Sequence, residues 1–402
     1  MEKSCESFVT DCGYKISNLI VSKNMTHKKI GIITFHASHN YGSMLQAYAL
    51  QQTVLGMGLD CEIINFRTNI QTEHFKPPFM RGTIQGKIKR FIQYLPYCYS
   101  LFRKYELFEE FLTCHYKLSD KEYSSLSELE EANLPYDVII SGSDQIWNTY
   151  CFDFDWAYFL PFAKSAHRVA YAPSLGPTPF HSIRTEMEQQ IKSLIQNYDV
   201  VSVRDSLAQK ELKRLIGIEC PIMIDPTLLL PIQDWHVMAG NVPIVKGKYI
   251  FLYTPWYEKP VFDAAMVISK KLGLPVVVTQ LYDSWKRNSW IVDKTFKSYI
   301  STGPKEFLNL CKFATCTVGA SFHVAVFSIL FETPFYSVDG MKDSRVMELL
   351  AMTKLESRIW DSCQPPTAIS LNLNFNHAID VIESKRNNCI EWLDKKLMNM
   401  LG

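Results

Sequence analysis

The sequence predicts an α/β protein built from two Rossmann-like, doubly wound domains. Short apolar runs of strand length alternate with longer segments of helical periodicity along most of the chain, a pattern typical of parallel sheets with crossover helices. The length of 402 residues suits two such domains better than one. A second series of strands begins after a polar stretch at 232–248. Because ligands of such folds bind beyond the carboxyl ends of the strands, we expect a cleft between the two domains.

The pattern divides the chain into four parts. We expect a flexible N-terminal tail at 1–27, an N-terminal α/β domain at 28–231, a C-terminal α/β domain at 232–365 and a helical segment at 366–402. The tail is polar and aperiodic, and it lacks the basic and apolar regions of a secretory signal.

The composition narrows the class of protein. Forty-two basic residues against 41 acidic ones give a net charge of +1, which gives no reason to expect a nucleic-acid partner. The 11 cysteines form no C-x-x-C pair, so reduced thiols and a cytoplasmic location are expected. No apolar run is long enough to span a membrane. His36 and His39 lack a third ligand nearby, so no metal site is predicted.

The first βαβ unit begins at residue 28. Residues 28–35 read as a buried parallel strand, 43–58 as a helix with Ser43 as N-cap, and 61–67 as the next strand. A right-handed crossover joins two parallel strands of this kind.

An amphipathic helix is predicted from Thr83 to Leu95, ended by Pro96. Its apolar positions fall on one face, with basic residues beside them: Ile84, Ile88, Phe91, Ile92 and Leu95 against Lys87, Lys89 and Arg90. Two interpretations stay open. The apolar face packs on a domain, as in most amphipathic helices, or it contacts a membrane surface peripherally.

Further strands follow in order, and most of them lead into a helix. The N-terminal domain continues with strands at 136–142, 168–175, 198–203 and 221–225, and the C-terminal domain has strands at 248–254, 274–279, 315–319 and 335–338. Asp205 or Ser206 caps the helix after the third of these strands. A long amphipathic helix ends the chain.

His323 is the first candidate functional residue. It follows the strand at 315–319 and lies in the first turn of a helix for which Ser321 is a suitable N-cap. Free backbone N–H groups at such a helix start bind anions, and a histidine there can act as a general acid. A core histidine packed on the sheet is the structural alternative.

Arg204, Asp144 and Gln145 end two other strands. Arg204 can bind a carboxylate or phosphate bidentately, or it can form a salt bridge. The turn Ser-Gly-Ser-Asp-Gln at 141–145 either caps a helix or presents groups that bind sugar hydroxyls. Asn40, Tyr41 and Gly42 form the first strand–helix loop, which lacks the glycine spacing of dinucleotide or ATP sites.

In their order along the chain, these segments resemble the polysaccharide pyruvyl transferase family. The specific motifs are GSDQIWN and SFHVAVFS with a following Pro-Phe, and the resemblance covers nearly all of 28–355. It implies a glycosyltransferase-B-like fold, phosphoenolpyruvate as donor, no further cofactor, and a sugar diol, in many cases on a lipid-linked oligosaccharide, as acceptor. A nucleotide-sugar glycosyltransferase and a non-catalytic binding protein of polysaccharide assembly remain alternatives with the same fold.

The resemblance also implies roles for residues. His323 matches the proton-transfer histidine, and Arg204 and Arg345 match arginines that hold the donor. We therefore assign His323 and Arg204 as the catalytic residues, and Arg204, Arg345 and Ser321 to donor binding. Many members carry Arg-x-His where this chain has Ser321-Phe322-His323; Ser321 with the helix start, or Arg345, then takes the place of that arginine.

The acceptor is expected on the N-terminal domain. We assign acceptor binding to Asp144 and Gln145 together with the loop residues Asn40, Tyr41 and Gly42.

Overall fold

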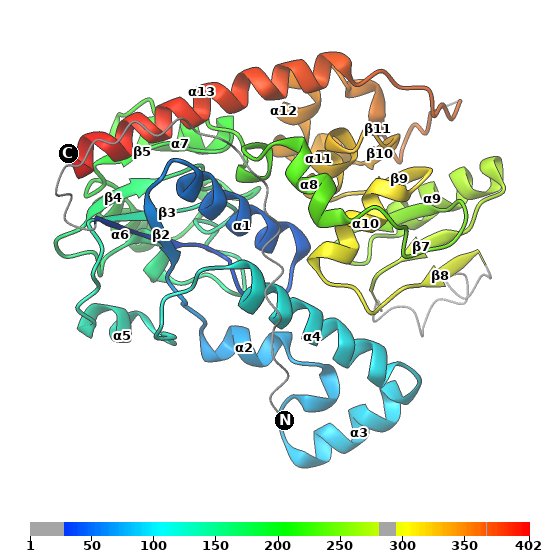
Figure 1. The fold of residues 1–402 in the computed structure, drawn as a ribbon, viewed down its shortest axis with the longest axis horizontal. Helices are drawn as coiled ribbons and strands as arrows, with labels where there is room; N and C mark the ends of the chain where they lie inside the picture. Colours follow the sequence, from blue (N-terminus) through cyan, green and yellow to red (C-terminus); the bar gives the residue numbers. More distant parts are fainter. Residues whose placement is uncertain (1–27, 281–294, 367) are drawn as a thin grey trace.

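The N-terminal half forms a fully parallel sheet of five strands (Figure 1). The computed structural model describes residues 28–280, 295–366 and 368–402, so the predicted tail at 1–27 lies outside the described residues. The strand order is β2-β1-β3-β4-β5, as in a doubly wound sheet. The strands are β1 (Lys29–Ile33), β2 (Asp60–Ile63), β3 (Val138–Ser141), β4 (His167–Ala170) and β5 (Val200–Val201).

Helices connect these strands and cover both faces of the sheet. On β1, Ile30 and Ile32 belong to the core under α1, whereas Ile33 belongs to the core on the opposite face. The helices are α1 (Tyr41–Gly56), α2 (Asn69–Phe75), α3 (Ile84–Tyr94), α4 (Cys98–His115), α5 (Leu126–Glu131), α6 (Thr185–Ile195) and α7 (Ser206–Ile216).

The C-terminal half forms a second parallel sheet, of six strands, in the order β11-β10-β9-β6-β7-β8. Alternation on β6 gives each face its own core: Ile250 and Leu252 pack against α9, and Phe251 packs with α10 and α11 on the other face. The strands are β6 (Ile250–Tyr253), β7 (Val276–Val278), β8 (Phe296–Ser298), β9 (Cys316–Gly319), β10 (Phe335–Val338) and β11 (Ile359–Trp360). The helices are α9 (Lys259–Leu272), α10 (Pro304–Phe313), α11 (Phe322–Leu330) and α12 (Ser344–Thr353).

The two parallel, doubly wound sheets therefore confirm the predicted fold class of two Rossmann-like α/β domains. The halves share one hydrophobic core at their junction, where the Tyr41 ring of α1 stacks on Phe307 of α10 at 4.7 Å between centroids. At this point side chains of the two domains pack directly against each other.

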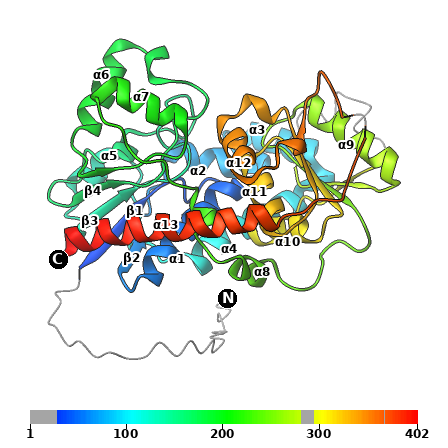
Figure 2. The ribbon, with the colours of Figure 1, turned by 90° about the horizontal axis from the view of Figure 1, so that it is seen from above.

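The last helix, α13 (Asn376–Leu401), returns from the C-terminal half to the N-terminal half (Figures 1 and 2). Arg386 Nε donates a hydrogen bond to the Leu228 carbonyl oxygen at 2.9 Å, and the Trp392 ring lies 6.5 Å from that of Tyr171. Leu393 and Leu397 are fully buried in the shared core. This helix holds the two halves together.

Several local predictions need correction. Asn40, not Ser43, caps α1, because its side chain accepts hydrogen bonds from the N–H groups of Gly42 and Ser43. Residues 221–225 form one isolated bridge beside Val203 instead of a strand. The polar stretch at 232–248 contains a helix, α8 (Ile232–Ala239), where the buried Trp235 supplies the anchor.

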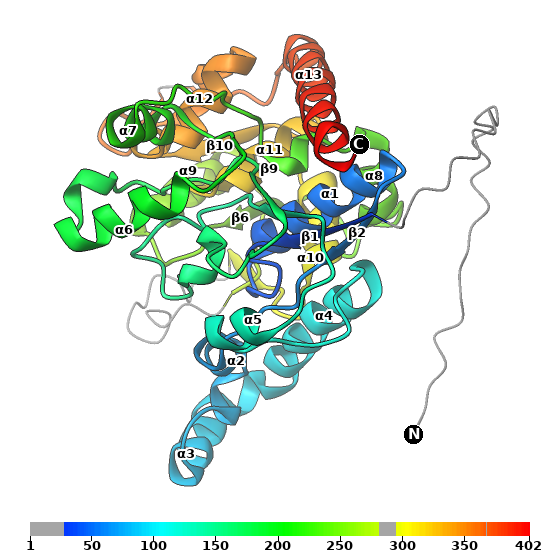
Figure 3. The ribbon, with the colours of Figure 1, turned by 90° about the vertical axis from the view of Figure 1, so that its left-hand side faces the viewer.

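The helix predicted at 83–95 exists, but its apolar face does not pack on a sheet. Thr83 caps α3, and none of the residues of α3 is buried. The helix lies at the tip of a projection from the body of the molecule, beyond α4 (Figures 1 and 3). The interpretation that this face packs on a domain is therefore wrong. None of the helices described is long and apolar enough to cross a membrane.

Candidate functional site

The site is built where the N-termini of α1 and α11 meet across the junction. A Cβ atom placed on Gly42 would lie 2.0 Å from Nδ1 of His323, so only glycine allows the imidazole of one domain to lie against the backbone of the other. The His323 side chain is 8% exposed. The histidine predicted to face a cleft is thus held between two helix starts.

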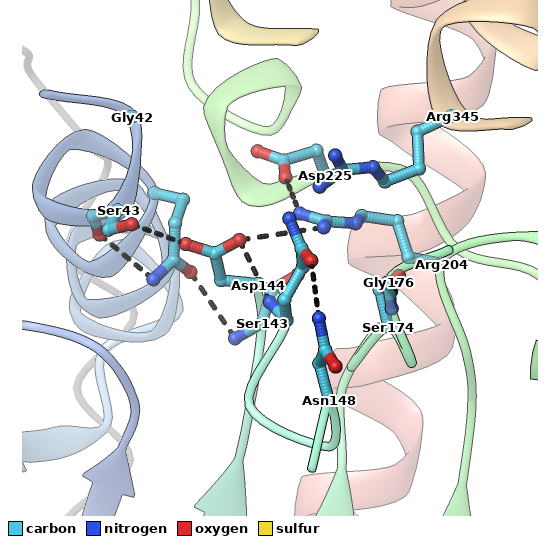
Figure 4. Close-up of polar contacts among 12 residues, drawn as sticks. Gly42, Ser43, Ser143, Asp144, Asn148, Ser174, Gly176, Arg204, Asp225 and Arg345 are labelled. Atoms are coloured by element: carbon cyan, nitrogen blue, oxygen red, sulfur yellow. Dashed lines mark hydrogen bonds and ion pairs between the residues drawn. The ribbon is translucent and has the colours of Figure 1, made fainter. Parts of the chain in front are cut away.

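Arg204 connects two buried carboxylates, Asp225 and Asp144 (Figure 4), and His323 lies beside Asp225. Arg204 Nη1 donates to Oδ2 of Asp225 at 2.7 Å, and its Nη2 lies 3.5 Å from Oδ1 of Asp144. Asp144 in turn accepts a hydrogen bond from the Ser43 hydroxyl at 2.6 Å, in the first turn of α1. His323 Nε2 lies 3.7 Å from the same Asp225 oxygen, longer than a hydrogen bond.

The two carboxylates are ionised at neutral pH. Burial alone would raise the pKa of Asp225, but the His323 imidazole, the Arg204 guanidinium and the Thr227 hydroxyl outweigh burial and hold that pKa below its usual value. For Asp144, burial is likewise outweighed by the charges of Arg204 and His323, which lower its pKa. The positive charge of Arg204 is therefore already balanced by protein groups.

Three polar atoms of this cluster have no hydrogen-bond partner among the described residues. They are Nε and Nη2 of Arg204 and Nε2 of His323, all with no contact to bulk solvent. Native proteins leave few buried donors unsatisfied, because each costs about 1–3 kcal/mol. The cluster is thus arranged to bind a polar group that supplies the missing acceptors.

Arg345 approaches the cluster from α12. The Phe322 ring lies near both arginines, with its centre 5.5 Å from the guanidinium carbon of Arg204 and 5.9 Å from that of Arg345. Arg345 donates to both oxygens of Asp343, at 2.9 and 2.6 Å. The amide of Gln145 lies 2.8 Å from its Nη1. Arg345 therefore also carries a carboxylate partner.

The structure brings most of the predicted residues together, but not all in the expected setting. Tyr41 is 1% exposed, and its hydroxyl lies 2.6 Å from Oγ1 of Thr302 across the junction. Asn40 serves as the cap of α1. Ser321 occupies the N-cap position of α11, but its side chain makes no capping hydrogen bond, so its hydroxyl is not used by the helix.

Sequence reasoning missed Asp225 and Gln46. Asp225 lies in a segment predicted to be a strand and turn, and the acidic residue directly after an apolar run was the available signal. Gln46 Oε1 accepts from the Ser143 backbone N–H at 3.3 Å, and its Nε2 donates to Thr34 at 2.9 Å. Gln46 therefore fixes the turn that carries Asp144. In the sequence it is a polar residue within a predicted helix, and this gives no sign of such a role.

This arrangement suits proton transfer beside a bound anion. His323 offers a ring nitrogen without a hydrogen bond, and Arg204 offers two donor atoms without one, of which Nη2 lies 3.5 Å from Asp144. The starts of α1 and α11 add favourable dipole ends. Within the described ranges, no group of three His, Cys, Asp or Glu side chains is placed to hold a metal ion.

Comparison with known sequences gives one family. The sequence model of the polysaccharide pyruvyl transferase family matches residues 40–340. The chain matches none of the curated proteins.

Solved structures resemble the chain only distantly. UDP-GlcNAc 2-epimerase from Methanocaldococcus jannaschii is 12% identical over 89% of this chain and 93% of its own, with a TM-score of 0.47. The glycosyltransferase SnogD from Streptomyces nogalater is 11% identical over 94% and 100%, with a TM-score of 0.39. MurG from Acinetobacter baumannii is 8% identical over 92% and 99%, with a TM-score of 0.44.

Proposed function

The chain belongs to the polysaccharide pyruvyl transferase family, whose sequence model spans residues 40–340, and from this premise we propose that it is a ketal pyruvyltransferase. It transfers the enolpyruvyl group of phosphoenolpyruvate to two hydroxyls of a sugar, in an oligosaccharide carried on a lipid, and releases phosphate. The observation that carries the proposal is the set of unsatisfied donors on His323 and Arg204 at the meeting of two helix starts. We propose a cytoplasmic location, where phosphoenolpyruvate is available.

His323 acts as the general acid in this mechanism. Its proton goes to the methylene carbon of phosphoenolpyruvate, which becomes a methyl group and leaves an oxocarbenium-like centre. One sugar hydroxyl attacks that carbon, phosphate departs with its bridging oxygen, and the second hydroxyl closes the ketal. Of the two hydroxyl protons, one returns to His323 and the other leaves with phosphate. A positioned acid of this kind contributes about 10²–10⁴ in rate.

Donor binding relies on hydrogen bonds more than on net positive charge. Arg204 faces Asp225 and Asp144, and Arg345 faces Asp343. Nε of Arg204, together with Nη2, which lies 3.5 Å from Asp144 without a hydrogen bond, therefore binds the donor through hydrogen bonds. The free N–H groups at the start of α11, with the Ser321 hydroxyl, supply a second anion contact.

The acceptor approaches from the N-terminal domain. Asp144 and Gln145 present oxygen and amide groups at the same cluster, and both suit sugar hydroxyls. Asn40, Tyr41 and Gly42 shape this side by capping and packing. A nucleotide-sugar transferase would use the same two-domain frame, so the released product is the decisive observable.

The test measures which product is released. The protein is incubated with phosphoenolpyruvate and a panel of lipid-linked oligosaccharides, and phosphate is followed together with the methyl signal of the ketal by NMR. Stoichiometric phosphate and ketal support the proposal. Release of nucleoside diphosphate from a sugar nucleotide, with no reaction of phosphoenolpyruvate, would replace it by glycosyl transfer. No turnover with either donor would indicate a non-catalytic binding protein.

A further inference from the structure

The tip of the α3 projection carries a large apolar surface that the rest of the protein does not cover. Two residues of α3 show its extent: Ile84 is 76% exposed and Ile92 is 68% exposed. The other exposed apolar side chains of this tip are Met80, Ile88, Phe91, Leu95, Tyr99 and Phe102. Monomeric proteins expose single apolar residues commonly, but contiguous groups of this kind mark interaction sites.

The same segment is strongly basic, although the whole chain is nearly neutral. Residues 74–105 contain no Asp or Glu. They contain seven basic residues: Lys76, Arg81, Lys87, Lys89, Arg90, Arg103 and Lys104. Lys87 and Lys89 are exposed on α3. Lys76 and Arg103 pair with Glu73, Glu106 and Glu110 at the margins of this segment, so the positive charge beside the apolar surface comes mainly from the exposed Lys87 and Lys89 of α3.

The projection is a folded element. The Thr83 hydroxyl caps α3, and Arg90 Nε donates to the Pro78 carbonyl oxygen at 2.6 Å. Phe79 packs edge-on against Phe91 at 6.1 Å. These contacts hold α3 against the preceding segment around Pro78 and Phe79, and they leave its apolar side exposed.

We propose that this surface docks the protein onto an anionic lipid bilayer, with α3 lying in the headgroup region. An exposed apolar helix face with Lys and Arg beside it is what interfacial helices use: the apolar residues enter the bilayer, and the basic ones bind anionic headgroups. A second copy of the chain fits this surface poorly. A symmetric contact would bring two basic segments together without acidic partners, and Lys is depleted in protein interfaces.

The docking surface is directly connected to the candidate site. Helix α4 carries the exposed Tyr99 and Phe102 near its start, and Phe108 further along it stacks on Tyr41 at 5.2 Å. Tyr41 immediately precedes Gly42, against which His323 packs. If the proposed function holds, the reacting groups lie within one helix of the lipid surface from which a lipid-linked acceptor would be reached.

The test uses the purified full chain and vesicles, and it requires no enzymatic activity. Wild-type protein is sedimented at low salt with vesicles of phosphatidylcholine alone and of phosphatidylcholine with 30% phosphatidylglycerol. We expect binding to the anionic vesicles at least tenfold above binding to the neutral ones, weakened by salt. Lys87→Glu with Lys89→Glu should reduce it about 30-fold or more, since one basic residue near such a surface contributes about fivefold.

A second variant pair isolates the apolar contribution. Ile88→Gln with Ile92→Gln keeps residues that favour helix and should abolish binding. Matched controls carry the same changes elsewhere: Lys270→Glu with Lys271→Glu on α9, and Val237→Gln, whose side chain is 70% exposed on α8. The controls should bind like wild type.

Two results would overturn the proposal. One is wild-type protein that stays in the supernatant with anionic vesicles at low salt. The other is a wild-type dimer, measured by analytical ultracentrifugation, that becomes monomeric in the Ile88→Gln, Ile92→Gln variant and does not bind lipid. Failure of vesicle binding leaves the donor and product test of the proposed function untouched, because that test is read in solution.

Discussion

At the scale of single residues, the candidate site depends on a balance between buried charges. Arg204 holds Asp225 and lies near Asp144, and His323 completes the group without a hydrogen bond to either. Such a cluster is stable only while each charge keeps its partner. Substitutions in this cluster distinguish residues that take part in the reaction from residues that neutralise a buried charge.

His323→Ala should reduce turnover by two orders of magnitude or more, because it removes the one ring nitrogen placed for proton transfer. The protein should remain folded, since the imidazole makes no hydrogen bond that the fold needs. Phosphate release and circular dichroism on the same sample measure the two effects. Turnover near the wild-type value in a folded variant would remove His323 from the mechanism.

Arg204→Ala should lower stability as well as raise the KM for the donor. Its removal leaves two buried carboxylates without a cation, and breaking a buried pair costs about 3–5 kcal/mol. Adding Asp225→Asn should restore part of the lost stability, because it removes one of those charges. Chemical denaturation measures the stability and donor saturation measures the KM. An unchanged stability and an unchanged KM would mean that Arg204 neither stabilises the buried carboxylates nor binds the donor.

There is a physical reason why the sequence did not indicate Asp225 as part of the site. The sequence indicates which side chains end a strand, and this was enough to predict Arg204, Asp144 and His323. It does not indicate which carboxylate neutralises which arginine, because that depends on how separate strands meet. Asp225 pairs with Arg204 from another segment, and this pairing appears only in three dimensions. Asp343 instead pairs with Arg345, two residues further on, at the start of α12.

At the scale of elements, the meeting of α1 and α11 decides the geometry of the site. The two helices come from different domains, and Gly42 and His323 are their contact. The start of one helix alone would not place a histidine beside an anion site. Close approach of the two backbones is therefore a requirement of the site.

Gly42→Ala tests this requirement. The added methyl group would collide with the His323 ring, so the ring must move and turnover should fall by at least tenfold. Gly56→Ala is the matched control in the same helix, because a Cβ there meets nothing within 4 Å. That variant should be neutral or slightly stabilised. Equal turnover of both variants would show that the His323 position is not critical.

Predictions of helices and strands were right where the spacing of apolar residues determines the element. They failed where the contact between elements determines which face is buried. Strand lengths, crossover helices and the amphipathic α3 follow from the spacing of apolar residues. The same spacing describes a core helix and an exposed one, so it could not place the apolar face of α3 in solvent. The setting of Tyr41 could not be predicted for a similar reason: an aromatic residue in a strand–helix loop suits a sugar site, and the structure shows its ring packed in the core between the domains.

At the scale of the whole molecule, α13 joins the halves into one stability unit. It starts at α12 in the C-terminal half and buries leucines against the N-terminal half. Because the core at the junction is shared, loss of packing there affects both sheets.

Leu397→Ala should therefore destabilise both halves together. A fully buried leucine costs about 2–5 kcal/mol when truncated, and we expect one unfolding transition at a lower temperature. Hydrogen exchange should report loss of protection in β1 and β9 alike. Met398→Ala, at a neighbouring side chain that is 49% exposed, is the control and should change stability little. Selective loss of protection in one sheet would mean that the halves unfold independently.

The position of α13 also determines when the N-terminal half can complete its packing during synthesis. The N-terminal sheet is complete once residue 201 has been made, but the helix that covers part of it ends at Leu401. At about 5–20 residues per second, roughly 10–40 s of translation separate the two events. During that interval the apolar side of β3 that α13 covers awaits a partner that is not yet synthesised, so the nascent chain is expected to need chaperones most in this period.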